Sequence, residues 1–346
     1  MGVGLGTVIA RVAMRSVLLV MCLACVIDRG AAKAQSLTAE AAVTGGYSTD
    51  DLAAAAAQLR AFGETRGSWR LFGELSWAGR SRDNVESDAF GAAYPYGRRL
   101  DVIEAYGERL FRPGRAVVDL RGGRFRPPFG ISSGSDHAYW GFLRPPAIRY
   151  AEFLVVSNTF LEHGIDVLAG VPRLTFEAAV GAPADVGDHR RRGGADTLVR
   201  VQGYAGRFIV GVSHMQTSPI EPAAIAPGRA SFTGIDARWM SGGVQLRGEW
   251  VDGRPFDGAT STGWYADVIV HRSSMGPVTA LARVERLDHE GLSEADDEHL
   301  SRETLGARVR ISDGLSVTIN ALHQSGDPRY RPNALDVALT WSVRSR

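Results

Sequence analysis

Arginine and carboxylate side chains recur at every second position along many segments of the chain, with apolar residues between them. Guanidinium groups bind phosphates and carboxylates through paired hydrogen bonds, so arginines of this kind could attract anions. Most of them have an acidic neighbour on their own or the adjacent segment, and such pairs could equally form a hydrated wall of near-neutral charge. The side chains concerned are Arg70, Glu74, Asp119, Arg121, Arg200, Asp236, Arg238, Arg247, Glu249, Arg283, Glu285, Arg308 and Arg310.

Residues that could perform catalysis or bind a metal give a weaker signal. His214, His271 and His323 lie close in sequence to Ser213 or Ser273 or near strand ends, but no acid completes a nucleophile, base and acid set. The eight histidines show no spacing typical of metal ligands. We therefore expect no catalytic residue, no metal and no cofactor.

The segments that carry these charges have the alternation of β-strands. Residues 68–77 read SWRLFGELSW, which places Trp69 and Trp77 at the ends of an aliphatic face and Arg70 and Glu74 on the opposite face. The same alternation recurs along the chain and predicts sixteen strands. They cover 38–47, 53–64, 67–79, 100–112, 115–126, 160–170, 172–181, 195–205, 207–217, 230–240, 243–252, 262–271, 276–287, 302–311, 315–324 and 334–343.

One of these segments also has the pattern of a helix. Residues 48–51 are polar and precede five alanines, which is typical of a capped helix start. We predict a strand at 53–64 instead, because a short turn joins it to the strand at 67–79. The number of strands is then even, and both ends of the chain lie on the same side.

Three features favour a membrane barrel over a soluble β-sandwich. The apolar faces are tipped with tryptophans, as in the aromatic girdles of barrels in lipid. The opposite faces carry too many charges for a dry core, where each unpaired ion costs several kcal/mol. Short turns alternate with longer loops. The predicted fold class is all-β, a transmembrane antiparallel β-barrel of about 16 strands with an aqueous lumen.

The first 34 residues have the pattern of a secretory signal peptide. Two arginines precede the apolar run 16–27, and Ala32-Lys33-Ala34 offers a cleavage site. We assign 1–34 to the signal and 35–346 to the barrel. The signal holds both cysteines, four of the 39 basic residues and one of the 38 acidic residues. The mature chain therefore lacks cysteine and has a net charge of about −2, which gives no support for a nucleic-acid partner.

Several motifs resemble the phosphate-selective porin O and P family. Residues 122–130 read GGRFRPPFG, which is similar to the Gly-x-Phe-x-x-Pro-Phe-Gly sequence that enters the long third loop of that family. The further motifs, in the family's order, are EAY at 104–106, QLRGEW at 245–250, GWY at 263–265 and RVERLD at 283–288. The resemblance implies a sixteen-stranded, trimeric outer-membrane channel that passes anions. Phosphate-binding members resemble one another in a lysine cluster, which the lysine-free mature chain cannot supply.

The loop at 127–159 is long enough to need a function. We expect it, as the third extracellular loop, to fold into the lumen and narrow the pore; the alternative is an external lid. The expected constriction and anion contacts are Arg144, Arg149, His137, Arg121, Arg308 and Arg310, of which Arg308 and Arg310 lack an acid on their own strand face. The expected lumen wall includes Arg70, Glu74, Arg238, Arg247, Glu249 and Arg283.

The expected function is that of a porin in the outer membrane of a Gram-negative bacterium. Such a channel lets small hydrophilic solutes and ions diffuse passively, here with a mild preference for anions, because pore diameter and charge set selectivity without catalysis. The alternatives are an outer-membrane barrel enzyme of the lipase or protease kind and a plugged structural or adhesive barrel. Expected partners are small hydrophilic or anionic solutes, membrane lipid and lipopolysaccharide, and further copies of the chain in a homotrimer.

Overall fold

The computed structural model describes residues 34–50, 52–65, 68–81, 89–90, 100–131, 141–149, 162–183, 195–217, 230–255, 259–291, 297–326 and 332–345. The predicted signal peptide lies outside these residues except for Ala34, where the first strand begins. No helix in the described part of the chain is long and apolar enough to cross a membrane.

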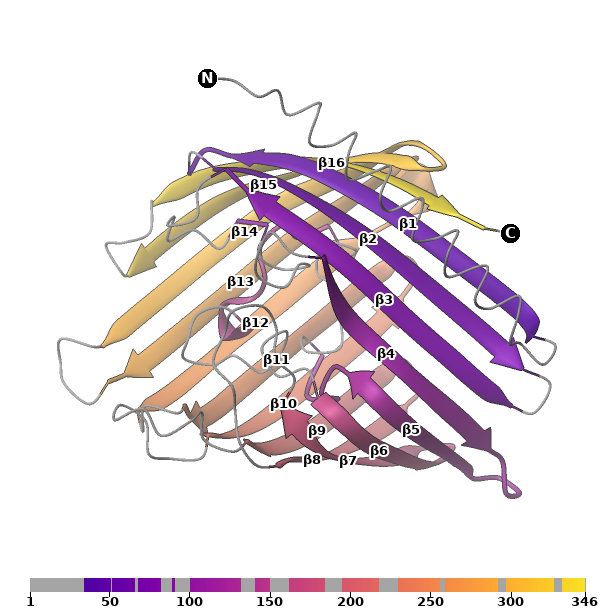
Figure 1. Ribbon diagram of the computed structural model, residues 1–346. Coiled ribbons are helices and arrows are strands. Elements are labelled where there is room, and N and C mark those ends of the chain that lie inside the picture. The colour runs from indigo at the N-terminus through magenta and orange to yellow at the C-terminus, as the bar shows by residue number, and fades with distance from the viewer. Residues whose placement is uncertain are drawn as a thin grey trace.

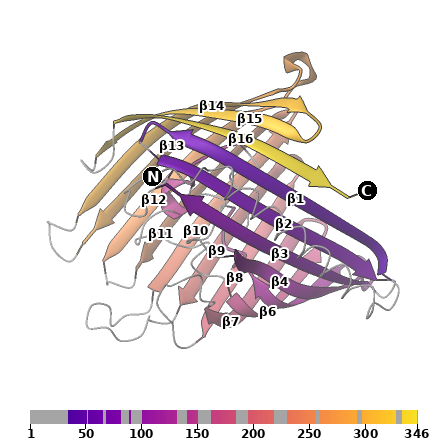
Figure 2. The same ribbon diagram turned by 45° about the horizontal axis from the view of Figure 1, so that its top comes forward.

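Sixteen antiparallel strands form one closed barrel, in which each strand pairs with its neighbours in sequence and β1 pairs with β16 (Figures 1 and 2). The strands are β1 (Ala34–Ser48), β2 (Leu52–Thr65), β3 (Trp69–Arg80), β4 (Leu100–Phe111), β5 (Val117–Phe125), β6 (Glu162–Val171), β7 (Leu174–Pro183), β8 (Asp196–Ala205), β9 (Phe208–Thr217), β10 (Ala230–Ser241), β11 (Val244–Arg254), β12 (Thr260–Val270), β13 (Val278–Glu290), β14 (Glu298–Ser312), β15 (Leu315–Gly326) and β16 (Asn333–Arg344). All sixteen predicted strands are confirmed, with shifts of a few residues at their ends.

The alanine-rich segment forms β2, as predicted against its helical propensity. It pairs with β1 from Leu52 to Thr65 and with β3 from Ala54 to Glu64. Propensity is a weak preference that tertiary context overrides. A helix here would leave the facing backbone groups of β1 and β3 without partners, which is costly in lipid.

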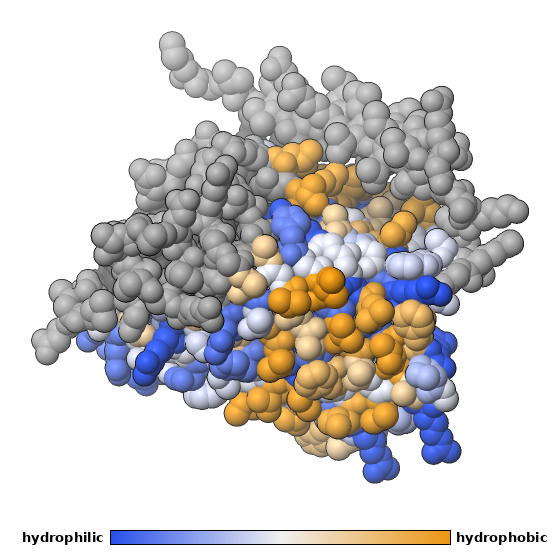
Figure 3. Space-filling view, turned by 60° about the horizontal axis from the view of Figure 1, so that its bottom comes forward, coloured by the Kyte–Doolittle hydropathy of each residue, from blue (hydrophilic) through white to orange (hydrophobic). Residues whose placement is uncertain are grey.

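The two faces of the barrel differ in polarity as the alternation predicts. On β3, Trp69 and Leu71 are exposed on the outside, whereas Glu74 and Ser76 are buried on the inside. Apolar residues gather on the outer face that Figure 3 turns toward the viewer. An apolar outside around a charged inside is the arrangement of a barrel in lipid.

The short turns have the backbone geometry of tight hairpins. Between β10 and β11, Gly242 and Gly243 have φ values of 56° and 79°. Two consecutive positive φ angles are required by the type I′ turn, whose twist matches that of the flanking strands. The strand ends that the longer connections join lie at the opposite end of the barrel.

The two described segments of the loop between β5 and β6, here called L3 (residues 126–161, described at 126–131 and 141–149), lie in the lumen. β5 ends at Phe125 because Pro127 and Pro128 have no amide hydrogen to continue the ladder. Phe129 and Ile148 of L3 then join the main buried apolar cluster inside the barrel. The wall residues of that cluster are Ala179, Leu198, Met215, Ala230, Phe232, Val251, Tyr265, Leu287 and Leu300. The predicted inward fold of the third loop is confirmed for its described segments.

Candidate pore constriction

The first described segment of L3 is attached to the inner wall of β8, β9 and β11. The amide of Gly130 donates to Ser213 Oγ at 3.1 Å, and its carbonyl oxygen accepts from Arg200 at 2.7 Å. The amide of Ile131 donates to the Glu249 carboxylate at 3.2 Å. Gly130 has φ 57°, and a Cβ there would lie 1.6 Å from a Glu249 oxygen, so only glycine fits this close approach.

The second described segment is attached to β14 and β15. The side chain of Asn320 accepts from the amide of Leu143 at 2.7 Å and donates to the carbonyl oxygen of Gly141 at 3.1 Å. Arg302 donates to the carbonyl oxygen of Pro145 at 2.8 Å. Both wall residues are almost fully buried, so these bonds form out of contact with water. Buried backbone groups of the loop are thereby paired, as the interior of a protein requires.

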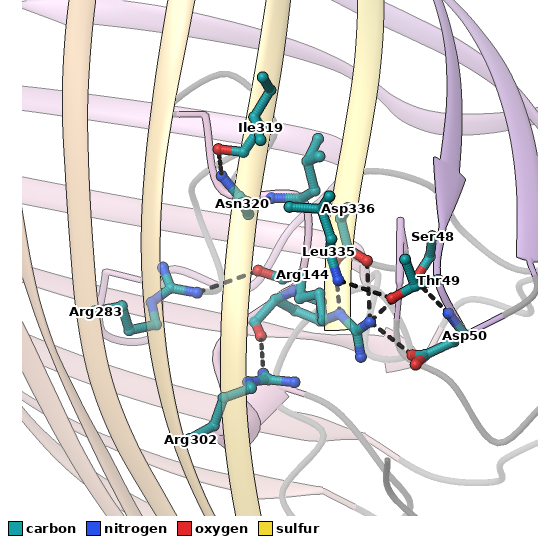
Figure 4. Close-up of polar contacts among 12 residues, drawn as sticks. Ser48, Thr49, Asp50, Arg144, Arg283, Arg302, Ile319, Asn320, Leu335 and Asp336 are labelled. Atoms are coloured by element: carbon teal, nitrogen blue, oxygen red, sulfur yellow. Dashed lines mark hydrogen bonds and ion pairs between the residues drawn. The ribbon is translucent and has the colours of Figure 1, made fainter. Parts of the chain in front are cut away.

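Wall charges of β13 complete this attachment next to the short helix Ala147–Arg149. The Glu285 carboxylate accepts from the amide of Ala147 at 2.5 Å and from Arg302 at 2.5 Å. Arg283 donates to the carbonyl oxygen of Arg144 at 3.2 Å. Figure 4 shows Arg283 and Arg302 reaching the loop from the strands behind it.

The side chain of Arg144 joins L3 to the seam where the barrel closes. Its guanidinium forms ion pairs with Asp50 in the β1–β2 turn at 2.6 Å and with Asp336 on β16 at 2.7 Å. It also donates to Ser48 Oγ at 3.3 Å (Figure 4). Arg144 is only 3% exposed. This placement makes Arg144 an anchor of the loop, and its charge is already matched by two carboxylates.

A second buried charge cluster lies on β11, β12 and β13. Asp267 stands directly opposite Arg247 and Arg283 and accepts from both, at 2.8 Å and 2.7 Å. The Arg283 guanidinium also lies over the Phe142 ring of L3 at 4.0 Å and over Tyr265 at 5.2 Å. Cation–π contacts of this kind gain strength when they are desolvated.

The ion pairs of the inner wall mostly join residues on different strands. Residues two apart on a strand are about 7 Å apart, whereas directly opposite residues on neighbouring strands approach to ~5 Å. The sequence places acidic neighbours on the same or the adjacent strand, and adjacent strands supply most of the ion pairs that the structure shows. The structure pairs Arg70 with Glu108, Arg60 and Arg126 with Glu74, Arg121 with Asp166 and Glu177, Arg200 with Asp236, and Arg302 with Glu285.

The remaining predicted constriction residues fall in different places. Arg121 lies against Tyr106 and is paired with wall carboxylates. Arg308 donates to Ser316 at 3.3 Å and borders L3 at Gly141, while Arg310 is exposed. His137 and the side chain of Arg149 lie outside the described residues. The predicted wall residue Arg238 lies opposite Arg247 on the inner face, and its guanidinium is within 3.1 Å of the Gln202 side-chain amide.

Several residues that hold the loop or pair with arginines of the wall were not singled out from the sequence. They are Asp50, Asp166, Asp267, Arg302 and Asn320. The four strand residues occupy inward positions of their alternating strands, so the period of two contains the signal for them. Their partners depend on the strand register, which that period does not specify. No group of three or more potential metal ligands occurs within the described ranges.

No model of a protein family matches the sequence, and no curated protein sequence matches it. Solved structures do resemble the fold. OmpF of Salmonella typhi, in complex with daunomycin, has a TM-score of 0.63 at 11% identity, over 89% of this chain and 97% of that one. The anion-selective porin from Comamonas acidovorans has a TM-score of 0.60 at 11% identity, over 89% and 99%. A trimer form of OmpT, an outer-membrane protein of Vibrio cholerae, has a TM-score of 0.57 at 10% identity, over 89% and 98%.

The chain thus has the fold of outer-membrane porins over nearly the whole length of these structures. At such low identity the likeness concerns the fold. The predicted location in the outer membrane of a Gram-negative bacterium is consistent with this fold.

Proposed function

We propose that the protein is a porin that lets small hydrophilic solutes and ions diffuse across the outer membrane. The observation that carries this proposal is the seating of L3: buried ion pairs and hydrogen bonds hold it inside a closed barrel whose inner wall is charged. A segment held in this way narrows a pore to a defined diameter. The diameter of the pore and the charge of its wall determine which solutes a channel admits.

Reconstitution into planar lipid bilayers tests this function. We expect large, stable conductance steps, because the barrel has the sixteen strands of channels with an aqueous lumen. We also propose a homotrimer, by analogy with the trimer form of the Vibrio cholerae protein. Closure in three equal steps would support it. Purified, folded protein that produces no steps would exclude the porin, and closure in one step would exclude the trimer.

A mild preference for anions is proposed for the wall beside L3. Arg308 borders the loop and Arg310 faces the lumen from the same strand, so both could add positive potential there. The resemblance to phosphate-selective porins points the same way, and the anion-selective Comamonas acidovorans porin shares the fold. Phosphate selectivity itself would have to come from arginine, since the mature chain has no lysine.

The double variant Arg308→Ser with Arg310→Ser is expected to lower the chloride-to-potassium permeability ratio. Reversal potentials in a KCl gradient measure this ratio. The fall should be larger in dilute salt, where the screening length is ~10 Å at 0.1 M, than at 1 M, where it is ~3 Å. Arg173→Ser is the control, since it removes an arginine from a tight turn outside the lumen. An equal change in the control would show that general charge, and not the wall beside L3, sets the ratio.

The alternative of a barrel enzyme finds little support in the histidines that suggested it. The Nδ1 atoms of His214, His271 and His323 lie 2.9 to 3.1 Å from a threonine or asparagine side chain. A serine does contact a histidine where Ser261 Oγ lies 2.6 Å from His289 Nδ1. Both residues are only 1% exposed, so a substrate could not reach the hydroxyl.

A further inference from the structure

Three aromatic side chains form a row across the inner wall of β2, β3 and β4. Phe62 stands directly opposite Phe72, and Phe72 directly opposite Tyr106. The rings of Phe72 and Tyr106 have centroids 5.2 Å apart and are tilted by 31°. Phe62 and Phe72 face the lumen, because Arg60 and Glu74, each two residues away on the same strand, form an ion pair there.

The row begins at L3 and becomes more exposed with distance from it. Tyr106 packs against the buried apolar cluster of L3, Phe72 is half-buried, and Phe62 is 36% exposed. A ring exposed to an aqueous lumen contributes little of the ~25 cal/mol per Å² that its burial would yield, so folding alone does not account for its position. The observation that points to a ligand is therefore the alignment of the three rings in one row, with an exposed ring at its end, rather than the exposure of a single side chain.

Lumen-facing rows of charge flank the aromatic row on both sides. On the side of the short turns, Arg70 pairs with Glu108 at 2.9 Å, and on the other side Arg60 pairs with Glu74 at 3.1 Å. Both arginines are partly exposed, so solutes in the lumen can reach them. The two rows contain Arg60, Arg70, Arg121, Arg126, Glu64, Glu74, Glu104 and Glu108.

This arrangement favours one chemical class of ligand. The arginines of both rows are paired with carboxylates, so the rows give an anion or a cation little net attraction. They do offer donors and acceptors side by side, which hydroxyl groups can use because each hydroxyl both donates and accepts. The faces of the rings are electron-rich and attract the C–H groups of a saturated ring. Neutral sugars combine those C–H faces with peripheral hydroxyls.

We propose that this aromatic row binds the sugar rings of neutral oligosaccharides as they pass through the channel. Strands of such barrels tilt by roughly 40°, so a row perpendicular to the strands also climbs along the pore axis. A chain of sugar rings can then move from Phe62 to Phe72 while its hydroxyls exchange partners in the flanking rows. The proposal rests on the proposed porin function and names a solute class for it.

Current block by maltohexaose, an uncharged chain of glucose rings, tests the proposal in planar bilayers. We expect brief interruptions of current whose frequency saturates with sugar concentration. The double variant Phe62→Leu with Phe72→Leu should weaken the block by about tenfold, because it keeps apolar bulk and removes two ring faces. Leu71→Ala is the matched control, since Leu71 lies between Arg70 and Phe72 in sequence but faces outward.

Uncharged polyethylene glycol of similar size separates binding from simple obstruction. Equal block by this polymer, or block unchanged in the double variant, would overturn the proposal, as would a conducting channel that maltohexaose leaves unblocked. Block by benzoate in place of the sugar would assign the row to aromatic acids instead.

A channel without conductance would refute the porin function alone. Calorimetric titration of the detergent-solubilised protein with maltohexaose would then show whether the aromatic row binds the sugar. If the double variant fails to insert, the comparison of sugar with polymer on the unaltered protein decides.

Discussion

Substitution of Arg144 by alanine is expected to raise the single-channel conductance and to make the open channel noisier. Arg144 connects L3 to Asp50 and Asp336, and both of these carboxylates are buried. Removal of one partner from a buried ion pair costs about 3–5 kcal/mol, because the remaining charge has no counter-charge. Part of that cost is avoided if the loop segment 141–149 leaves the wall and admits water. A displaced and mobile L3 would widen the pore and let its diameter fluctuate.

Arg173→Ala is the control for this variant, since Arg173 is an exposed arginine in a tight turn outside the lumen. It should leave mean conductance and noise nearly unchanged. The double variant Arg144→Ala with Asp336→Ala should lose less stability than the sum of the losses of the two single variants, because the effects of residues in direct contact are coupled. Arg144→Ala channels with the conductance and noise of the unaltered protein would show that the other contacts of L3 suffice. The permeability ratio should change little, since two carboxylates already neutralise this guanidinium.

The alternation of side chains contains most of the information about the barrel. A period of two separates inside from outside on every strand, and charged inner faces with apolar outer faces exclude a dry core. Even β2 follows from this pattern, although five consecutive alanines favour a helix when taken alone. The two prolines after Phe125 similarly predict where β5 must stop, and the aromatic residues beyond them predict that L3 needs an apolar surface.

Pairing across strands is the part that the alternation does not contain. The period places Asp267 on the inner face, but only the register sets it between Arg247 and Arg283. A shift by two residues would keep every side chain on its face and change every ion pair. The same limit applies to Arg144. The sequence places this residue in a long loop that is rich in arginines and aromatic residues. Its partners, Asp50 and Asp336, lie far away in the chain. Because the sequence does not reveal these distant partners, it predicts that Arg144 is free to bind anions.

The largest loss of barrel stability is expected for Asp267→Asn. Asp267 is 1% exposed and is the shared partner of Arg247 and Arg283, which are themselves buried. Asparagine keeps the size of the side chain. It removes the negative charge that lies between the two guanidinium groups on the flanking strands. Removal of the charge of one partner from a buried ion pair costs about 3–5 kcal/mol, a large fraction of the 5–15 kcal/mol by which folded domains are typically stable. Arg283 also positions the Phe142 ring of L3, so the loop should loosen together with the wall.

Heat modifiability on electrophoresis gels measures this effect, because folded and unfolded barrels migrate differently. The midpoint of unfolding should fall clearly for Asp267→Asn. Asp288→Asn is the matched control: Asp288 on the neighbouring strand also pairs with an arginine, Arg286, but Asp288 is half-buried and Arg286 is exposed, with side-chain exposures of 30% and 54%. Solvent-exposed ion pairs contribute about 0–1 kcal/mol to the free energy of unfolding, so the unfolding midpoint of the control should lie near that of the unaltered protein. Equal midpoints for the two variants would mean that water reaches the buried cluster and screens its charges, and the interior of the barrel around L3 would then be wetter than its packing indicates.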